Sequence, residues 1–284
     1  MGPISPSALR GFQYVSKITD VFSHWTTLYL MKSKSDTLDT IKLFVHSVVM
    51  PMGRRVHRLR TDKGGEYIGK DFRDYCINSG VKLEFAATAT PQQIGISERV
   101  GGVLVGMVRC WLASTGLPAF LWGELLMTAA HVSNRVPHSA LKMETPYKRL
   151  YGVEEDLSYT RVIGTQAFVH IETYVPKLKL RAVPARLVGY AFDSKGYRLW
   201  DPVGKKVIER RNVAFIESPA TCGLRSWRHP AWLGLQVHKR GLLSTGFPPT
   251  CIATRFARVH CVSLLPSGGN RYARRLECPH GPSI

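Results

Sequence analysis

Residues 59–67, "LRTDKGGEY", pass from a β-rich run through Asp62 into a Gly-Gly pair and a second acid. The preceding "RVHRLRT" (55–61) predicts a strand, which places Asp62 at the carboxyl end of that strand. Taken alone, Asp62 is best interpreted as a turn residue, because Asp, Lys and Gly-Gly are common between a strand and a helix. The alternative is a metal ligand at a strand end, and only the neighbouring residues can decide between the two.

The residues ahead of this segment predict two strands and a helix. "GFQYVSKIT" (11–19) and "HWTTLYLMK" (24–32) are β-rich runs around a short turn, which is typical of an antiparallel pair. Ser35 is a candidate N-cap for the helix that follows, and Pro51 with Gly53 ends it.

The residues after Asp62 continue the alternation of helices and strands. Residues 69–80 predict a helix and 81–85 a strand. A second helix is expected from an N-cap at Ser97, with Glu98 in its first turn, and a third over about 118–136. The sum is an α/β layer with a mixed sheet, in which ligands gather beyond the carboxyl ends of strands.

The pattern changes in the second half of the chain. Short strands separated by turns over roughly 165–218 predict a β meander or small barrel, whereas no sustained period follows Ser218. We therefore expect three regions: an α/β core over 1–150, a small β module over 151–218, and an unassigned, basic and disordered tail over 219–284.

The composition favours a polyanionic partner. The chain has 39 Lys and Arg against 20 Asp and Glu, a formal net charge of +19, although a basic solvated surface without a specific partner is the simpler alternative. The six cysteines include no C-x-x-C pair and predict reduced thiols. No apolar run is long enough for a membrane helix, so we expect an intracellular protein that does not bind membranes.

Asp62 and Glu98 form the candidate chemical site. A carboxylate at a strand end and another on a crossing helix can share divalent ions, as two-metal phosphoryl transfer requires. Each acid has an ordinary structural explanation, since Glu98 is already favoured in a first helical turn by the helix dipole.

Five separated motifs favour a metal site over the ordinary structural roles of Asp62 and Glu98. They are "LRTDKGGEY", "TATPQQIGISER", "LPAFLWGELLMTAAHVSNRVP", "TPYKRLYG" and "VGYAFDSKGYRLWDPVGKKVIERRNVAFIES", in this order. Over about residues 2–218 the chain thereby resembles the integrase of copia-type retrotransposons. The separation of 36 positions between Asp62 and Glu98 matches the family's second-to-third acid spacing.

The resemblance implies an RNase H-like core, with flanking helices and a following small β-barrel, that cuts and joins DNA with Mg²⁺ or Mn²⁺. It implies that Asp62 and Glu98 are catalytic metal ligands and that Arg99 is a phosphate contact. It also implies self-association on DNA ends and a nuclear site of action. The residues expected to bind nucleic acid are Lys63, Arg99, Arg109, Lys205, Lys206, Arg210 and Arg211.

The chain also departs from the family pattern. The family's first acid lies just ahead of a Gly-Pro pair, and here Gly2-Pro3 follows only Met1, so we expect that acid and its strand to be missing. "FQYVSKIT" would then have an exposed edge. Asp20 is interpreted as a turn residue rather than a substitute ligand. Gly101, Gly102 and Gly106 should each weaken the helix that begins at Ser97 by about 1 kcal/mol relative to Ala.

Three hypotheses follow. The first is an integrase-like polynucleotidyl transferase core that is inactive because two carboxylates hold a metal pair poorly. The second is a non-catalytic nucleic-acid-binding remnant, based on the net charge and "KKVIERR" (205–211). The third is a decayed element with no selected function, whose tail is translated in another frame and whose product folds poorly.

Overall fold

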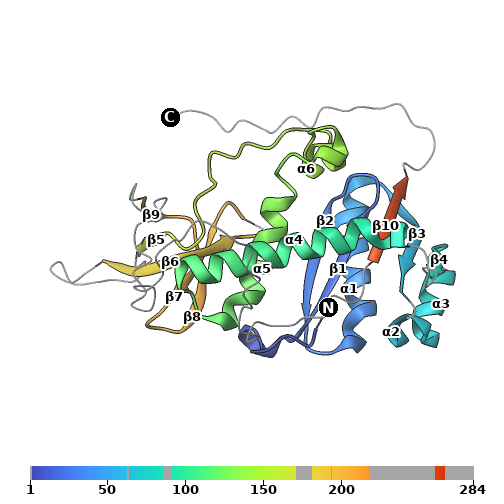
Figure 1. Ribbon diagram of the computed structural model, residues 1–284, viewed down its shortest axis with the longest axis horizontal. Coiled ribbons are helices and arrows are strands. Elements are labelled where there is room, and N and C mark those ends of the chain that lie inside the picture. Colours follow the sequence, from blue (N-terminus) through green and yellow to red (C-terminus); the bar gives the residue numbers. More distant parts are fainter. Residues whose placement is uncertain are drawn as a thin grey trace, which may run out of the picture.

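The computed structural model describes residues 2–62, 64–85, 91–170, 181–192, 194–217 and 260–265, and for 91–94, 96 and 260–265 only the backbone (Figure 1). The strands are β1 Tyr14–Asp20, β2 Thr26–Met31, β3 Arg55–Thr61, β4 Lys82–Phe85, β5 Gln166–His170, β6 Ala182–Tyr190, β7 Tyr197–Asp201, β8 Lys206–Arg210, β9 Val213–Ile216 and β10 His260–Leu265. The α-helices are α1 Thr37–Phe44, α2 Gly65–Ile68, α3 Lys70–Asn78, α4 Pro91–Thr115, α5 Trp122–Ser133 and α6 Pro146–Tyr151.

The first sheet has five strands in the order β2-β1-β10-β3-β4. β1 and β2 form the predicted antiparallel pair, and β3 lies parallel to β4. The expectation of an exposed edge on β1 is wrong, because β10 pairs with that edge (Figure 1). Six residues of the tail are thus part of the core sheet. The sequence after Ser218 has no periodicity that predicted this strand.

Local signals set the ends of the elements around this sheet. The cap ahead of α1 is Ser33 rather than Ser35: its side chain accepts a hydrogen bond from the backbone, and Asp36 reaches back to complete a capping box. After α1 the helical run passes through a wider π-helical turn, Val45–Val49, and a tight 3-10 turn, Met50–Met52. It ends at Gly53, which has φ +64°, as expected for a glycine after a helix.

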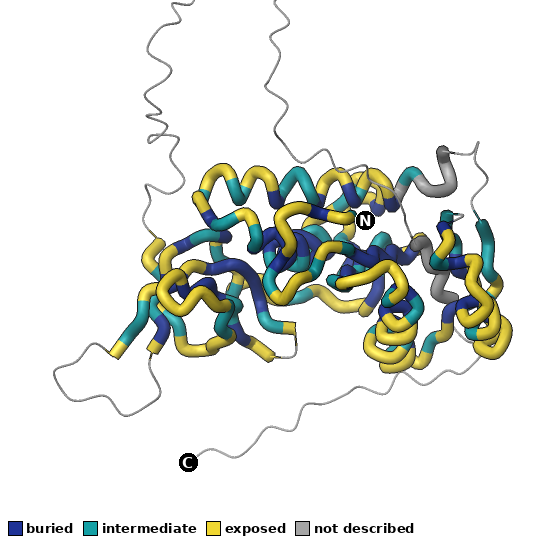
Figure 2. The backbone as a smooth tube through the Cα atoms, turned by 90° about the horizontal axis from the view of Figure 1, so that it is seen from below, coloured by how far each residue is buried: buried dark blue, intermediate teal, exposed yellow. Residues whose placement is uncertain are grey.

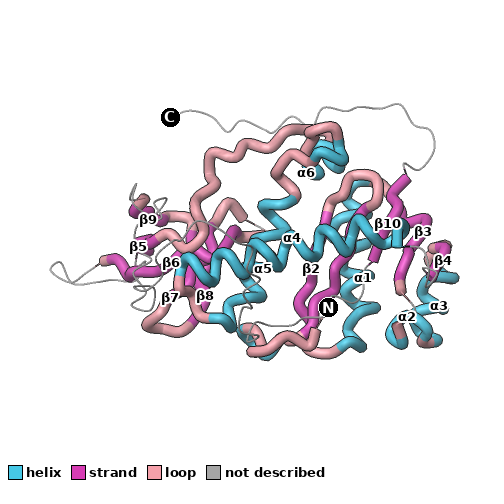
Figure 3. The backbone as a smooth tube through the Cα atoms, viewed as in Figure 1, coloured by secondary structure: helices cyan, strands magenta, loops and turns pink. Residues whose placement is uncertain are grey.

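Helices cover both faces of the first sheet. On one face, α1 and α3 pack an apolar cluster against β1 and β3, including Ile18, Phe44, Leu59 and Phe72. On the other face lie α4 and α5, with Leu104 and Leu125 fully buried (Figure 3). The prediction of an α/β core with a mixed sheet and flanking helices is confirmed.

The second sheet is antiparallel, in the order β8-β7-β6-β5-β9, and confirms the predicted meander (Figure 3). Its edge strands are β8 and β9. A bulge between Leu187 and Gly189 lets β6 approach α5 closely. A Cβ at Gly189 would lie 2.2 Å from Oγ1 of Thr128, so the contact requires glycine at this position.

α5 lies between the two sheets and joins them. It contacts both β2 and β6, and one hydrophobic cluster runs from Val15 and Leu28 of the first sheet to Leu187 and Trp200 of the second. In Figure 2 most of the dark blue, buried segments lie in the middle of the molecule. The sheets therefore share a core, and the expected boundary at residue 150 stays a prediction.

Polar contacts fix α5 to each sheet. The side-chain amide of Asn134 accepts from the backbone N–H of Thr26 at 2.9 Å and donates to its carbonyl at 2.8 Å. On the other side, Arg198 donates two 2.8 Å hydrogen bonds to the carboxylate of Glu124. Bidentate contacts of this kind orient both partners as well as attracting them.

His131 of α5 lies half-buried at the same junction. Its ring stacks on Tyr190 at 4.7 Å between centroids, and Nε2 lies 3.1 Å from the hydroxyl of Tyr159. Burial, assisted by the positive charge of Arg135, lowers the pKa of His131 to about 3. Burial likewise raises the pKa of Tyr159 to about 12. Both rings are therefore neutral near pH 7.

Within the described part of the chain, no helix combines the length and the hydropathy needed to cross a membrane. The two cysteines whose side chains are described, buried Cys76 and exposed Cys110, are free thiols.

Candidate functional site

Asp62 lies at the point where β3 ends and the chain turns toward α2. Buried Leu59 and Thr61 anchor the end of the strand, and Asp62 follows directly with a half-buried side chain. One carboxylate oxygen accepts a hydrogen bond from the backbone N–H of Gly64 at 3.3 Å. Asp62 thus stabilises its own turn, while its position at a carboxyl strand end also suits a ligand site.

Glu98 lies on α4, but not where the sequence predicted. α4 begins at Pro91, so the predicted start at Ser97 is wrong and Glu98 falls well inside the helix. Proline is well suited to a first helical turn, because its missing N–H would have no helical partner there. Glu98 and Arg99 are exposed, whereas Ser97 is buried against the sheet.

Lys17 is a site residue that the sequence analysis missed. It lies on β1, is 1% exposed, and its ammonium donates to the backbone carbonyl of Ser97, beneath the turn that carries Glu98. A buried ammonium is costly unless polar groups surround it. The available signal was a lysine in the middle of the strand "YVSKITD", flanked on both sides by strand-forming residues.

The described carboxylates do not assemble into a metal centre. Among the residues that the structure describes, no three His, Cys, Asp or Glu side chains gather to hold an ion. Asp20, at the end of β1, accepts hydrogen bonds from the backbone N–H of Ser23 at 2.8 Å and from its hydroxyl at 2.6 Å, which confirms its interpretation as a turn residue. The residues present therefore do not fit a pair of divalent ions, which needs a fuller oxygen cage.

A basic cluster lies on the strand that leads to Asp62. Arg58 and Arg60 alternate with buried Leu59, and Lys82 is the partner of Arg58 on β4. Glu84 neutralises part of this charge, at 3.2 Å from Arg58, 3.1 Å from Arg60 and 3.7 Å from Lys82. Although burial raises the pKa of Glu84, the hydrogen bond from Arg60 and the neighbouring positive charges outweigh it, so that pKa is lowered. Three cations against one acid leave a positive surface.

The predicted nucleic-acid contacts fall into two groups. Arg99 and Arg109 are exposed on α4, whose outer face is open to solvent (Figure 2). Lys205, Lys206, Arg210 and Arg211 are exposed along the edge strand β8 and its flanking turns in the second sheet. The structure does not bring the second group next to Asp62 (Figure 1). Lys63 lies outside the described residues.

Two family models match the chain. Residues 3–91 match the integrase core domain, and residues 165–224 match the retroviral polymerase SH3-like domain. The chain therefore contains an integrase core domain and a retroviral polymerase SH3-like domain, and is called the integrase segment below. The resemblance predicted from the five motifs is thereby confirmed, and the second sheet is the SH3-like domain of this integrase segment. Asp62 lies inside the matched core, and Lys205 to Arg211 lie inside the SH3-like match.

Curated relatives extend the same relationship. The retrovirus-related Pol polyprotein from transposon TNT 1-94 of Nicotiana tabacum is 36% identical over 218 residues, which cover 76% of this chain and 16% of that protein. The Pol polyprotein from transposon RE2 of Arabidopsis thaliana is 27% identical, over 74% of the chain and 14% of its own length. The integrase segment thus spans about a sixth of the length of these relatives.

Solved structures include more distant similarities. A simian T-cell lymphotropic virus intasome in complex with the PP2A regulatory subunit B56 gamma aligns with a TM-score of 0.40 and 18% identity, over 71% of each chain. The HTLV-2 integrase catalytic core domain in complex with magnesium, in a trimeric form, aligns with a TM-score of 0.39 and 17% identity, over 53% of this chain and 93% of that one.

Proposed function

We propose that the integrase segment binds DNA through its basic surface and that, as given, it does not catalyse strand transfer. The observation that carries the proposal is the content of the sheet beside Asp62. Of the two strands beside β3, β10 ("HCVSLL") contains no Asp or Glu, and Glu84 of β4 is paired with Arg58 and Arg60. Beyond β10, Asp20 of β1 is engaged by Ser23.

The chemistry explains why this matters. In-line transfer of a phosphodiester with two divalent ions needs carboxylates that hold both ions and stabilise the attacking and leaving oxygens. The integrase core family depends on divalent metal, and Mg²⁺ or Mn²⁺ would supply that stabilisation. In this chain, Asp62 and Glu98 are residual ligands, and the buried ammonium of Lys17 beneath the Glu98 turn opposes a cation there.

A strand-transfer assay tests the catalytic part of the proposal. We expect the purified chain to give no Mg²⁺- or Mn²⁺-dependent joining of an oligonucleotide end to target DNA. Asp62→Asn and Glu98→Gln serve as matched controls, because each removes one charge without changing the side-chain size. Metal-dependent product that either substitution abolishes would contradict the proposal.

DNA binding is proposed to rest on charge rather than on base recognition. Exposed Arg58 and Lys82 and half-buried Arg60, together with exposed Arg99 and Arg109, provide cations on the core. The edge strand β8 adds a second basic surface. Each phosphate contact contributes about 0.9 to the slope of log K against log salt for duplex DNA.

A salt titration with two charge-matched variants tests this second part. We expect Lys205→Gln with Lys206→Gln to weaken binding to duplexes of unrelated sequence equally and to reduce the salt slope by about 2. Lys32→Gln with Lys142→Gln removes the same charge from exposed lysines outside the second sheet and should change the slope less. Equal effects of the two pairs would show that only net charge matters and would remove β8 from the proposal.

We also propose that the segment self-associates on DNA and acts in the nucleus. The support is the match to the integrase core domain, and the viral neighbours include an intasome and a trimeric catalytic core domain. Light scattering with and without DNA measures the first. Microscopy of the tagged chain measures the second, and a monomer on DNA or exclusion from the nucleus would refute the respective statement.

A further inference from the structure

In the centre of the first sheet, β1 and β3 are separated by a slot one strand wide. The six residues of β10, which come from far along the chain, fill this slot. β10 lies parallel to β1, with Ile18, Thr19 and Asp20 opposite His260, Cys261 and Val262. It lies antiparallel to β3, where Cys261 is opposite Arg60. We propose that this slot is a peptide-binding site for an extended strand and that residues 260–265 of the same chain are its ligand.

The backbone supplies the first argument. Without a strand between them, β1 and β3 would each present a row of N–H and carbonyl groups toward the slot (Figure 1). Unpaired backbone groups away from water are costly, and an open strand edge is a template for another strand. A segment in the slot pairs on both sides, whereas a strand added to an outer edge of a sheet pairs on one side only.

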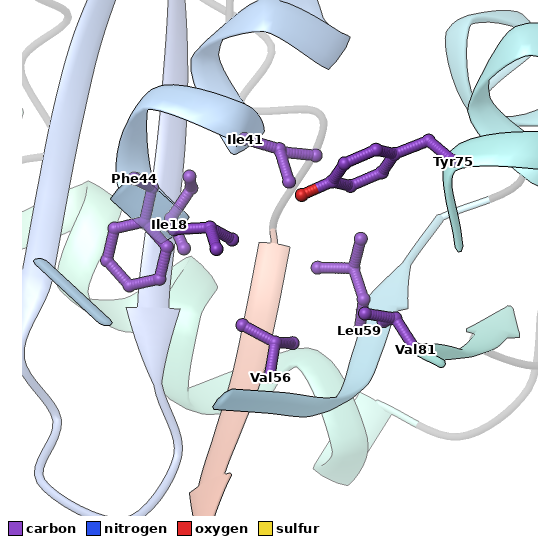
Figure 4. Close-up of a pocket in the computed structure, with 8 residues that line it drawn as sticks. Ile18, Ile41, Phe44, Val56, Leu59, Tyr75 and Val81 are labelled. Carbon is purple, nitrogen blue, oxygen red and sulfur yellow. The ribbon is translucent and has the colours of Figure 1, made fainter. Parts of the chain in front are cut away.

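The face toward α1 supplies the second argument. Ile18 of β1 and Val56 and Leu59 of β3 line an apolar pocket with Ile41 and Phe44 of α1. Figure 4 shows β10 passing behind this pocket, with Ile18 on one side of the strand, Leu59 on the other and Val56 drawn across it. The pocket therefore draws its walls from both sides of the slot.

The pairing register of β10 with β3 places some of the apolar residues of β10 opposite the residues of β3 that line the pocket. Val262 stands opposite Leu59, and Leu264 stands opposite Val56, so two of the three aliphatic positions of "HCVSLL" correspond to residues that line the pocket, whereas Leu265 stands opposite Arg55. Cys261 and Ser263 correspond instead to Arg60 and Arg58. The slot thus favours an extended peptide in which aliphatic residues alternate with small polar ones.

The length of the intervening chain favours the same molecule as the source of the strand. Glu217 and His260 are 43 residues apart, and an extended chain covers roughly 3.3 Å per residue, so reach does not limit insertion. A tethered ligand has an effective concentration of the order of millimolar for a short linker, and this value falls roughly as the −3/2 power of linker length. A strand from a second copy would have to compete with the effective concentration that remains for a connection of this length.

Cross-linking in the full chain tests the register and the source together. In Arg60→Cys, the new thiol lies directly opposite native Cys261, at a separation between neighbouring strands that a disulfide accepts. Arg58→Cys is the matched control: it also removes a partner of Glu84, but it faces Ser263, and its diagonal distance to Cys261 of roughly 7–8 Å is too long.

We expect mild oxidation of Arg60→Cys to form an intrachain disulfide between the introduced thiol and Cys261. This bond should form at least ten times faster than any bond to Cys261 in Arg58→Cys, as read by peptide mass spectrometry. Equal rates, or no such bond, would overturn the proposed register. A bond between two chains would overturn the assignment of the strand to the same molecule.

A cleavage experiment tests binding directly. A protease site inserted between residues 230 and 231 of the full chain is cut after purification, and we expect the fragment with residues 260–265 to co-elute with the core. Val262→Asp with Leu264→Asp should abolish co-elution, while Cys261→Ser with Ser263→Ala should preserve it. Release of the unsubstituted fragment from a core that still unfolds cooperatively would refute the proposal.

Discussion

The two five-stranded sheets of this integrase segment share one hydrophobic core but are assembled from the chain in different ways. In the second sheet, every described strand pair lies between residues 166 and 216. In the first, Thr19 of β1 is paired with Cys261 of β10, 242 positions away. Turn chemistry can specify the second sheet, whereas only tertiary pairing can complete the first.

This difference shows which contacts the stability of each sheet depends on. The second sheet depends on local register and on α5, which packs against β6. The first depends on a strand that is distant in the sequence. Closing the long loop between this strand and its partners costs chain entropy before their contacts form. α5 contacts both sheets, so changes in this helix should show whether they unfold together or apart.

The largest expected effect comes from the centre of the shared core. Leu125 of α5 is fully buried, and Leu125→Ala should lower the free energy of unfolding by about 2–5 kcal/mol through lost burial and a residual cavity. Denaturation followed by tryptophan fluorescence and by circular dichroism should give one coincident transition. Two separate transitions would contradict a single shared core.

The next effect is a dependence of stability on pH. The unfolded chain protonates His131 near pH 6.5, whereas the folded chain resists protonation until about pH 3, so the unfolded state binds more protons between these values. Stability is complete above pH 6.5 and is lost as the pH falls, by up to about 1.4 kcal/mol per pH unit from this residue. His131→Gln should flatten the decline. An unchanged slope in urea titrations from pH 7 to 5 would place the origin elsewhere.

A smaller effect is expected at the contact between α5 and the second sheet. Glu124→Gln removes the charge that Arg198 binds at 2.8 Å and should cost about 1–3 kcal/mol, because both side chains are largely buried. A double-mutant cycle with Arg198→Met isolates the pair. Arg198 also lies 3.6 Å from Glu209, so Glu209→Gln is the matched control and should cost less.

The smallest effect concerns α4, which packs along both sheets. A Cβ at Gly102 or Gly106 would meet no atom within 4 Å outside the helix itself. Each change to alanine should therefore stabilise the protein by roughly 0.5–1 kcal/mol through helix propensity alone. Thermal melts of the single and double variants measure this gain, and a loss of stability would indicate that these glycines make a close contact.

The elements that the sequence predicted well have strong local signals. "RVHRLRT" became β3 with the predicted bounds, and Gly53 and Gly80 end their helical runs with positive φ. The start of α4 was wrong because Ser97 resembles an N-cap locally, while packing against the sheet continues the helix back to Pro91. Lys17 was missed because a lysine in the middle of "YVSKITD" marks an unusual strand position but does not reveal that a helix will cover it.

The sequence by itself determined the family, the β3 strand with Asp62 at its end, and the antiparallel meander, because motif order, strand period and turn residues are local properties of the chain. Only the tertiary structure decided that residues 260–265 fill the centre of the first sheet, that Lys17 lies beneath Glu98, and that α5 unites the two sheets. The physical reason is that backbone pairing and burial depend on which surfaces meet in space, and no short-range pattern records that partner.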